Sequence, residues 1–164
     1  MTDTDVLIAG GGPAGLVLAL ELGARGVSCV LLNDTPVTAQ HPKANAISSR
    51  TMEHLRRHGI AARLRSRGLD KDHPTDLTYF TSLTDYEIGR FRMPSGHEAL
   101  AEARSGAGAW ASAEPPLRCS QIFLEEELKR GVDDLASVDV RFGWRLVGFE
   151  DTGKAVQAVV ENGE

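Results

Sequence analysis

A glycine-rich segment close to the start of the chain constrains the fold more than any other feature. Val6–Ala9 is a short, continuous apolar run, which is typical of a strand buried on both faces of a parallel sheet. The segment Gly10–Gly15 interrupts it, a helical pattern continues to about Arg25, and Cys29–Leu32 is a second apolar run. The apolar side of the helix consists of Leu16, Ala19, Leu20 and Gly23. Strand, glycine turn, helix and strand predict a βαβ unit, and hence a Rossmann-like α/β fold with a parallel sheet.

The glycines have the spacing of the dinucleotide-binding fingerprint, Gly10-x-Gly12-x-x-Gly15, between a strand and a helix. The first glycine permits a tight turn, the second lets a pyrophosphate approach the backbone, and the third lets helix and strand pack closely. The N–H groups at the start of the helix, around Pro13 and Ala14, then face the phosphate charge. We therefore predict a dinucleotide site here. The alternative is a glycine turn with a purely structural role.

The end of the second strand predicts where the adenosine ribose binds. An acidic residue usually accepts hydrogen bonds from the ribose there, but the equivalent position, seven residues beyond Gly26, is Asn33. One amide carbonyl in place of a carboxylate predicts a weaker ribose contact, or some tolerance of a 2′-phosphate. Asp34 follows, and in an extended chain its side chain points the other way.

The rest of the chain predicts further short elements. After a loop that reaches Ala46, we expect helices from Ser48 or Ser49 to His58, with Ser49 as the N-cap, and from Ile60 to Arg67. Two strands, Leu77–Thr81 and Glu87–Phe91, suggest a hairpin. Residues 94–116 are rich in Pro, Ala, Gly and Ser and predict a mobile surface segment with a weak helix at Glu98–Arg104.

A clearer helix is predicted from Gln121 to about Asp133. Its inward stripe is Phe123, Leu124 and Leu128, and we expect Glu125 and Glu126 on the wet side, four residues before Lys129 and Arg130. Three strands follow, Val138–Phe142, Arg145–Glu150 and Ala155–Glu161. Asn162-Gly163 then predicts a hairpin turn with no return strand, which suggests a chain truncated inside a sheet; a frayed terminus is the alternative.

Composition excludes several classes of function. The 23 acidic and 18 basic residues leave a net charge of −5, which argues against a nucleic-acid partner. The apolar runs are too short to span a membrane, and Asp3 and Asp5 do not suit a signal peptide. Two cysteines and five scattered histidines predict neither a disulfide framework nor a metal site. We therefore expect a cytoplasmic protein.

Three segments carry a family resemblance: Asp5–Leu32, Pro42–Gly59 with its Pro-Lys-Ala and Arg-Thr-Met-Glu, and Ser120–Glu125. Together they resemble the FAD-dependent aromatic-ring monooxygenases with the para-hydroxybenzoate hydroxylase fold, closest to the phenol and chlorophenol hydroxylase-like branch. The resemblance covers essentially the whole chain but only the amino-terminal part of that family's chain. The Asp-Gly and Gly-Asp motifs of the family do not occur in this sequence.

The resemblance implies a role for particular residues. The FAD pyrophosphate would lie against the glycine loop, and Asn33 would face the adenosine ribose. Lys43 and Arg50 would supply positive charge near the flavin and phosphates, and Gln121 would contact the ribityl and pyrophosphate region. A solvated helix-terminal arginine is the alternative for Arg50, and ordinary first-turn capping is the alternative for Gln121.

The resemblance also implies a function. FAD, reduced by NAD(P)H, would serve the hydroxylation of a small phenolic substrate by a protein that can form a homo-oligomer. Residues 1–164 would be the amino-terminal part of the FAD-binding domain, and residues 76–116 an insertion on the substrate side. Two other hypotheses stay open: an NAD(P)-binding Rossmann module of another oxidoreductase, and a truncated, non-catalytic nucleotide-binding remnant. No catalytic residue is predicted.

Overall fold

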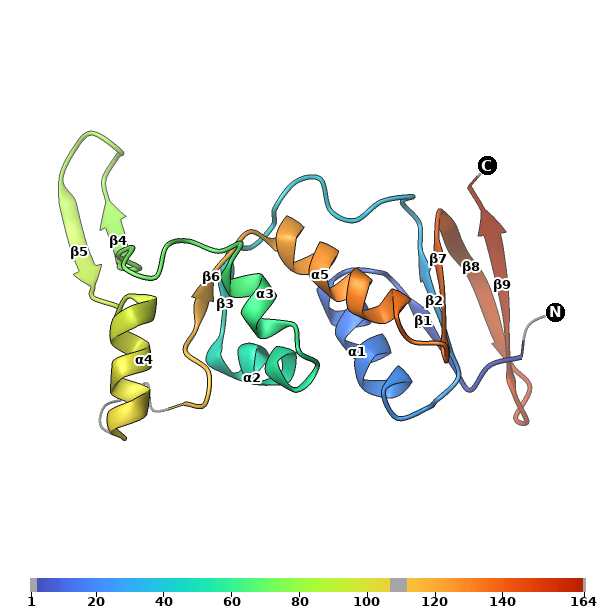
Figure 1. Ribbon diagram of the computed structural model, residues 1–164. Coiled ribbons are helices and arrows are strands. Elements are labelled where there is room, and N and C mark those ends of the chain that lie inside the picture. The colour runs from blue at the N-terminus through green and yellow to red at the C-terminus, as the bar shows by residue number, and fades with distance from the viewer. Residues whose placement is uncertain (1–2, 107–111, 164) are drawn as a thin grey trace. The chain divides into compact units, whose positions relative to one another are not determined.

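The computed structural model describes residues 3–106 and 112–163, which form two compact units. The first unit comprises residues 1–44 and 121–164, and the second comprises residues 45–120. Figure 1 labels the helices and strands of both.

A parallel sheet with the strand order β1-β2-β7 forms the centre of the first unit. Its strands are β1 (Val6–Ala9), β2 (Cys29–Asn33) and β7 (Val138–Phe142). Helix α1 (Pro13–Gly23) connects β1 to β2, and helix α5 (Gln121–Asp133) precedes β7 and packs against α1 (Figure 1). The predicted βαβ unit and the α/β fold are therefore confirmed.

Burial within this sheet follows strand position. Four residues of the central strand β2 are buried, and Leu31 is completely so. In β1 only Ile8 is buried, because β1 pairs on one side alone, with β2, in the part of the chain that the structure describes. The prediction that β1 is buried on both faces was therefore wrong: Val6 and Leu7 are half-buried, and Ala9 is exposed. The predicted inward residues of α1 are all buried: Leu16, Ala19, Leu20 and Gly23.

Helix α5 has the predicted bounds, and Leu124 and Leu128 of its predicted inward stripe are buried, but the buried face is wider than predicted. Phe123 is only half-buried, whereas Val132 is completely buried. Glu125, predicted on the wet side, is 4% exposed. Lys129 accordingly pairs with Asp133, at 2.8 Å between Nζ and Oδ2, and not with Glu125. The i,i+4 charge pattern was misleading because the partners of Glu125 are the Ala39 N–H and the Gln121 side-chain amide.

Strands β8 (Trp144–Asp151) and β9 (Val156–Asn162) form an antiparallel hairpin. The hairpin turn predicted at Asn162-Gly163 is not formed. Asn162 instead pairs with Trp144 at the end of the ladder, and the Gly163 N–H donates to the Gly143 carbonyl over 2.8 Å. Continued pairing with β8 keeps Asn162 in an extended conformation.

The second unit contains short elements. Strands β3 (Ala46–Ile47) and β6 (Leu117–Arg118) pair in antiparallel fashion, and helices α2 (Ser49–Arg57) and α3 (Ala61–Arg65) lie between them in sequence. The buried side chains of these helices and their junction are Met52, Leu55, Ile60, Ala61 and Leu64.

The cap of α2 differs from the prediction by one residue. Ser48, not Ser49, is the N-cap, and its hydroxyl accepts a hydrogen bond from the Thr51 N–H at 3.2 Å. Ser49 is already the first helical residue. Gly59 follows the C-cap of the helix with a φ of +70°, a conformation that glycine adopts without strain.

The predicted hairpin is confirmed, with β4 (Leu77–Phe80) antiparallel to β5 (Glu87–Phe91). Helix α4 (Gly96–Ser105) is longer and better capped than the weak helix expected within 94–116. Ser95 and Glu98 form a reciprocal capping box, which stabilises the first turn. Residues 107–111 of the predicted mobile segment lie outside the described residues. Across the described ranges, each helix is too short or too polar to cross a lipid bilayer.

Candidate functional site

The glycine loop joins the carboxyl end of β1 to the start of α1. The Gly10 N–H donates to the Leu32 carbonyl over 2.8 Å, which ties the loop to β2. Gly10 has a φ of +115°, in a region that side-chain-bearing residues rarely adopt. The Leu16 N–H then bonds to the Gly12 carbonyl at 2.9 Å and begins the helix. The loop is therefore a tight turn at the carboxyl ends of the parallel strands, which is where α/β proteins bind their ligands.

The glycines of the loop have different surroundings. A Cβ on Gly15 would overlap the Gly10 carbonyl oxygen. A Cβ on Gly11 would lie 2.8 Å from the Asn33 Cβ and 2.9 Å from Phe142 Cζ. A Cβ on Gly12 would meet nothing within 4 Å. Packing therefore requires glycine at positions 11 and 15, whereas the backbone at Gly12 borders open space.

The first turn of α1 has no anionic cap of its own. The N-cap, Gly12, makes no side-chain hydrogen bond, Pro13 follows it, and the turn contains no acidic residue. The N–H groups of Ala14 and Gly15 belong to the part of a helix where backbone donors have no intrahelical partner. Together with the helix dipole, these donors favour a negatively charged ligand.

Asn33 supports the loop from the end of β2. Its Oδ1 accepts a hydrogen bond from the Gly11 N–H at 3.0 Å. Its Nδ2 donates to the Thr35 carbonyl at 3.0 Å and to the Thr35 hydroxyl at 2.7 Å. Sequence reasoning placed Asn33 at the ribose but missed this brace. Asp34, the next residue, is exposed.

Gln121 and Glu125 hold the segment 34–44 against the start of α5. The Gln121 N–H donates to the Ala44 carbonyl at 3.0 Å, and Gln121 Nε2 donates to Glu125 Oε1 at 2.6 Å. The other oxygen of Glu125 accepts the Ala39 N–H at 2.8 Å. Glu125 is thus a residue of this site that sequence reasoning missed. The signal that could have found it is the spacing of four residues from Gln121.

The two predicted cationic residues lie in different units. Lys43 is exposed in the first unit. Arg50 is on α2 in the second, with an 80% exposed side chain that donates to Glu53 at 3.2 Å. The Ser112 hydroxyl, 2.9 Å from the other Glu53 oxygen, is the main cause that lowers the pKa of Glu53, and Arg50 adds to it. Arg50 is therefore partnered within its own unit.

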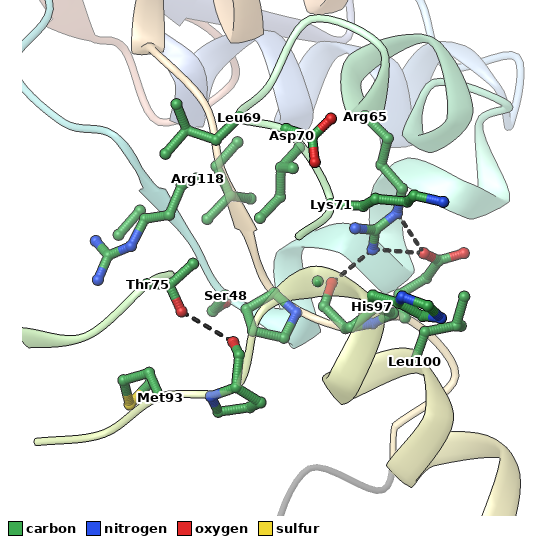
Figure 2. Close-up of a pocket in the computed structure, with 18 of the residues that line it drawn as sticks. Ser48, Arg65, Leu69, Asp70, Lys71, Thr75, Met93, His97, Leu100 and Arg118 are labelled. Atoms are coloured by element: carbon green, nitrogen blue, oxygen red, sulfur yellow. Dashed lines mark hydrogen bonds and ion pairs between the residues drawn. The ribbon is translucent and has the colours of Figure 1, made fainter. Parts of the chain in front are cut away.

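The second unit contains a pocket of about 690 Å³, within the size range of small-molecule sites (Figure 2). Apolar and polar side chains line it in nearly equal numbers. The polar and charged ones are Ser48, Arg65, Asp70, Lys71, Thr75, His97, Arg104, Glu114 and Arg118. The apolar side chains are Ala46, Ile47, Leu69, Met93, Pro94, Leu100, Ala113, Pro115, Pro116 and Leu117.

An ion pair between Arg65 and Glu114 forms part of the pocket wall. Two guanidinium nitrogens of Arg65 donate to one carboxylate oxygen, at 2.8 and 3.2 Å, and Arg65 also donates to the Pro115 carbonyl (Figure 2). The Thr75 hydroxyl donates to the Pro94 carbonyl at 2.9 Å. Other charged or titratable side chains also line the pocket: Asp70, Lys71, His97, Arg104 and Arg118. The pocket therefore offers both apolar and polar contacts to a small molecule.

In the part of the chain that the structure describes, the other reactive side chains form no recognisable centre. Cys29 and Cys119 are buried free thiols, and burial raises the pKa of each. Within residues 3–106 and 112–163, no cluster of three or more His, Cys, Asp or Glu side chains could hold a metal ion.

Comparison with known proteins agrees with this geometry. The model of the FAD-binding domain family matches residues 3–164. The FAD-dependent monooxygenase apdD of Emericella nidulans is 34% identical, over 94% of this chain and 25% of its own. A 2,4-dichlorophenol 6-monooxygenase of Cupriavidus pinatubonensis is 39% identical, over 95% of this chain and 25% of its own. The chain thus spans about a quarter of the length of these relatives.

A solved structure extends the comparison to the fold. The flavin-dependent monooxygenase PieE, crystallised with FAD and substrate, is 28% identical and superposes with a TM-score of 0.81. The match covers 98% of this chain and 27% of PieE. The chain belongs to the FAD-binding domain family, and its relatives include flavin-dependent monooxygenases, one of them a 2,4-dichlorophenol 6-monooxygenase.

Proposed function

We propose that the chain is the FAD-binding part of an NAD(P)H-dependent monooxygenase that hydroxylates a small phenolic substrate. The observation that carries the proposal is the uncapped first turn of α1 beside the open space at Gly12. This arrangement fits a pyrophosphate, because the backbone can be approached there and helix N–H groups are available to it.

Different residues of the first unit contact different parts of FAD. The N–H groups of Ala14 and Gly15 bind the pyrophosphate, and Gly12 lets it approach. Asn33 uses one lone pair of Oδ1 for Gly11, and the second can accept a hydrogen bond from the adenosine ribose. Gln121 contacts the ribityl chain.

Positive charge for the phosphates comes from side chains outside the loop. Lys43, exposed on the segment that Glu125 holds, supplies one charge. For Arg50, which lies on α2 of the second unit and contacts Glu53, a role toward the cofactor stays a prediction.

Bound FAD, once reduced by NAD(P)H, supplies the oxygen-transfer chemistry. The chain's own residues bind the cofactor, orient it and exclude water from part of it. In the second unit we propose that the pocket holds the aromatic ring, so that residues 76–116 belong to the substrate side. The pocket's volume and the apolar part of its lining support this, as does the substrate named for the Cupriavidus relative.

Titration of the purified chain with FAD, NADPH and NADH, followed by flavin and nicotinamide fluorescence, tests the proposal. We expect saturable binding of FAD, weaker than in proteins four times as long, because the chain spans about a quarter of its relatives. Binding of NADPH or NADH alone would identify a nicotinamide module instead. The absence of any binding would identify a non-catalytic remnant.

A further inference from the structure

Glu125 is a buried acid with an unusual set of partners. Its side chain is 4% exposed, whereas carboxylates are almost never so buried unless they are paired. Its partners in the described part of the chain are the Ala39 N–H and the Gln121 side-chain amide, neither of them charged. Burying a charge without a counterion is costly. A neutral residue would suit a purely structural role at this position better.

The Glu125 carboxylate determines which way the Gln121 amide faces. Both of its oxygens accept hydrogen bonds, Oε2 from the Ala39 N–H and Oε1 from Gln121 Nε2 at 2.6 Å. Gln121 therefore presents its NH2 group to Glu125. The carbonyl oxygen of Gln121 is then directed away from Glu125. It is an acceptor, which suits a hydroxyl group and does not suit a phosphate oxygen.

The same carboxylate also positions the segment that precedes the second unit. Glu125 Oε2 accepts the Ala39 N–H at 2.8 Å, and the Ala44 carbonyl accepts the backbone N–H of Gln121 at 3.0 Å. The segment that carries Lys43 is thereby fixed to α5 on both sides of that lysine. One side chain therefore sets the orientation of Gln121 and the course of residues 39–44.

We propose that Glu125 is a positioning residue of the FAD site. It fixes the Gln121 amide so that its carbonyl oxygen accepts a hydrogen bond from a hydroxyl group of the FAD ribityl chain. The proposal rests on the FAD-binding function proposed above. It predicts that Gln121 presents a hydrogen-bond acceptor to the cofactor, and a substitution at position 125 can replace this acceptor with a donor.

Glu125→Gln reverses that polarity with almost no change in shape. The new amide must keep its oxygen toward the Ala39 N–H, so its NH2 group faces Gln121, whose amide must then turn over. A donor replaces the acceptor that faces the ribityl hydroxyl, so the hydroxyl must now accept at this contact and direct its own proton elsewhere. We expect FAD to bind up to about tenfold more weakly, because the O–H of the hydroxyl loses its acceptor in the site. The thermal midpoint of the FAD-free protein should stay within about 2 °C of the wild type.

A double exchange tests whether the weaker FAD binding of Glu125→Gln comes from the reversed hydrogen-bond direction and not from altered packing. In the variant Gln121→Glu with Glu125→Gln, the carboxylate at 121 accepts from the amide at 125 and again presents an oxygen to the ribityl chain. We expect this variant to recover at least half of the lost binding free energy. Glu126→Gln, on the exposed neighbour, is the matched control and should bind FAD as the wild type does.

The outcomes separate this proposal from the one on which it rests. If Gln121→Ala binds FAD with wild-type affinity, Gln121 has no role in the site and the assignment to the ribityl chain fails. If Gln121→Ala weakens binding while Glu125→Gln does not, FAD binding stands and the positioning role is overturned. A double exchange that binds no better than Glu125→Gln also overturns it.

A measurement on the wild type covers the case in which Glu125→Gln does not fold. In ¹⁵N–¹H spectra of the FAD-free chain, the two Gln121 side-chain amide protons should differ, with one shifted downfield and slow to exchange. Two protons with the shifts and exchange rates of a solvated glutamine would overturn the proposal.

Discussion

The backbone N–H of Gly11 donates a hydrogen bond of 3.0 Å to Oδ1 of Asn33. This contact connects the glycine loop to the end of β2 across 22 residues of sequence. Asn33 Nδ2 donates to the carbonyl and the hydroxyl of Thr35. The same Thr35 carbonyl also accepts the Gly143 N–H at 3.0 Å. The loop is thus supported by the ends of the two strands that follow β1 in the sheet.

Asn33→Ala should lower the free energy of unfolding by about 1–2 kcal/mol, because it leaves the Gly11 N–H without its acceptor in a partly buried place. Urea denaturation followed by circular dichroism measures the change. Asp34→Ala, at the exposed neighbouring position, is the control and should change stability by less than about 0.5 kcal/mol. Equal stability of Asn33→Ala and wild type would show that the brace contributes nothing.

Two glycine substitutions should separate folding from binding. Gly12→Ala places a Cβ in open space, so the FAD-free protein should lose no more than about 1 kcal/mol of stability. Its affinity for FAD should fall at least tenfold, because the methyl group occupies the approach of the pyrophosphate. Thermal unfolding without FAD and a fluorescence titration with FAD measure the two effects.

Gly15→Ala should mainly affect folding, since its methyl group would overlap the Gly10 carbonyl oxygen. We expect it to destabilise the FAD-free protein by several kcal/mol or to prevent folding. Wild-type FAD affinity in Gly12→Ala would contradict the proposed position of the pyrophosphate.

The sequence predicted the βαβ unit because its information is local. Apolar runs, glycine spacing and the helix stripe of Leu16, Ala19 and Leu20 all lie within a short stretch, and each agrees with the others. Boundaries were less accurate: the N-cap of α2 is Ser48 and not Ser49, since both residues can cap a helix.

Contacts between distant parts of the chain could not be predicted in the same way. Glu125 was assigned to the wet face of its helix because it stands four residues before Lys129. Its actual partner, the Ala39 N–H, is 86 residues away, and nothing in the local pattern brings them together. The clash that excludes a side chain at Gly11 likewise involves Phe142 on a later strand. Sequence alone could name the candidate loop but could not assign a different role to each glycine.

The ion pair in the pocket wall should contribute to the stability of the second unit. The Arg65 and Glu114 side chains are 28% and 16% exposed, so solvent screens them only in part. Glu114→Gln should lower the free energy of unfolding by about 1–2 kcal/mol. Arg50→Gln, at the 80% exposed Arg50, is the matched control and should leave the urea midpoint unchanged. Equal changes in the free energy of unfolding for the two substitutions would show that the partly buried ion pair stabilises the protein no more than the exposed one does.

The hairpin β4–β5 should become less stable in acid because of Asp76. The Met93 N–H, and after it the Arg90 guanidinium, lower the pKa of the Asp76 carboxyl below its ordinary value. A lowered pKa in the folded state stabilises the protein above the ordinary pKa of about 3.9, and this contribution disappears as the pH falls through the folded value.

Asp76→Asn tests that dependence. Unfolding free energies measured between about pH 6 and about pH 2 should fall less steeply with acid in Asp76→Asn than in the wild type. The two proteins should differ by a constant amount at the upper end of that range, where the wild-type carboxylate is fully ionised. Parallel curves throughout would show that Asp76 does not couple folding to pH.

The account depends most on the backbone amides at the start of α1 binding the FAD pyrophosphate. Titration of the ¹⁵N-labelled chain with FAD, followed by ¹⁵N–¹H spectra, tests this directly. The resonances of Gly12, Ala14 and Gly15 should show the largest shifts and follow one saturable curve. If FAD binds while these three resonances stay in place, or if FAD does not bind at all, the central claim is wrong.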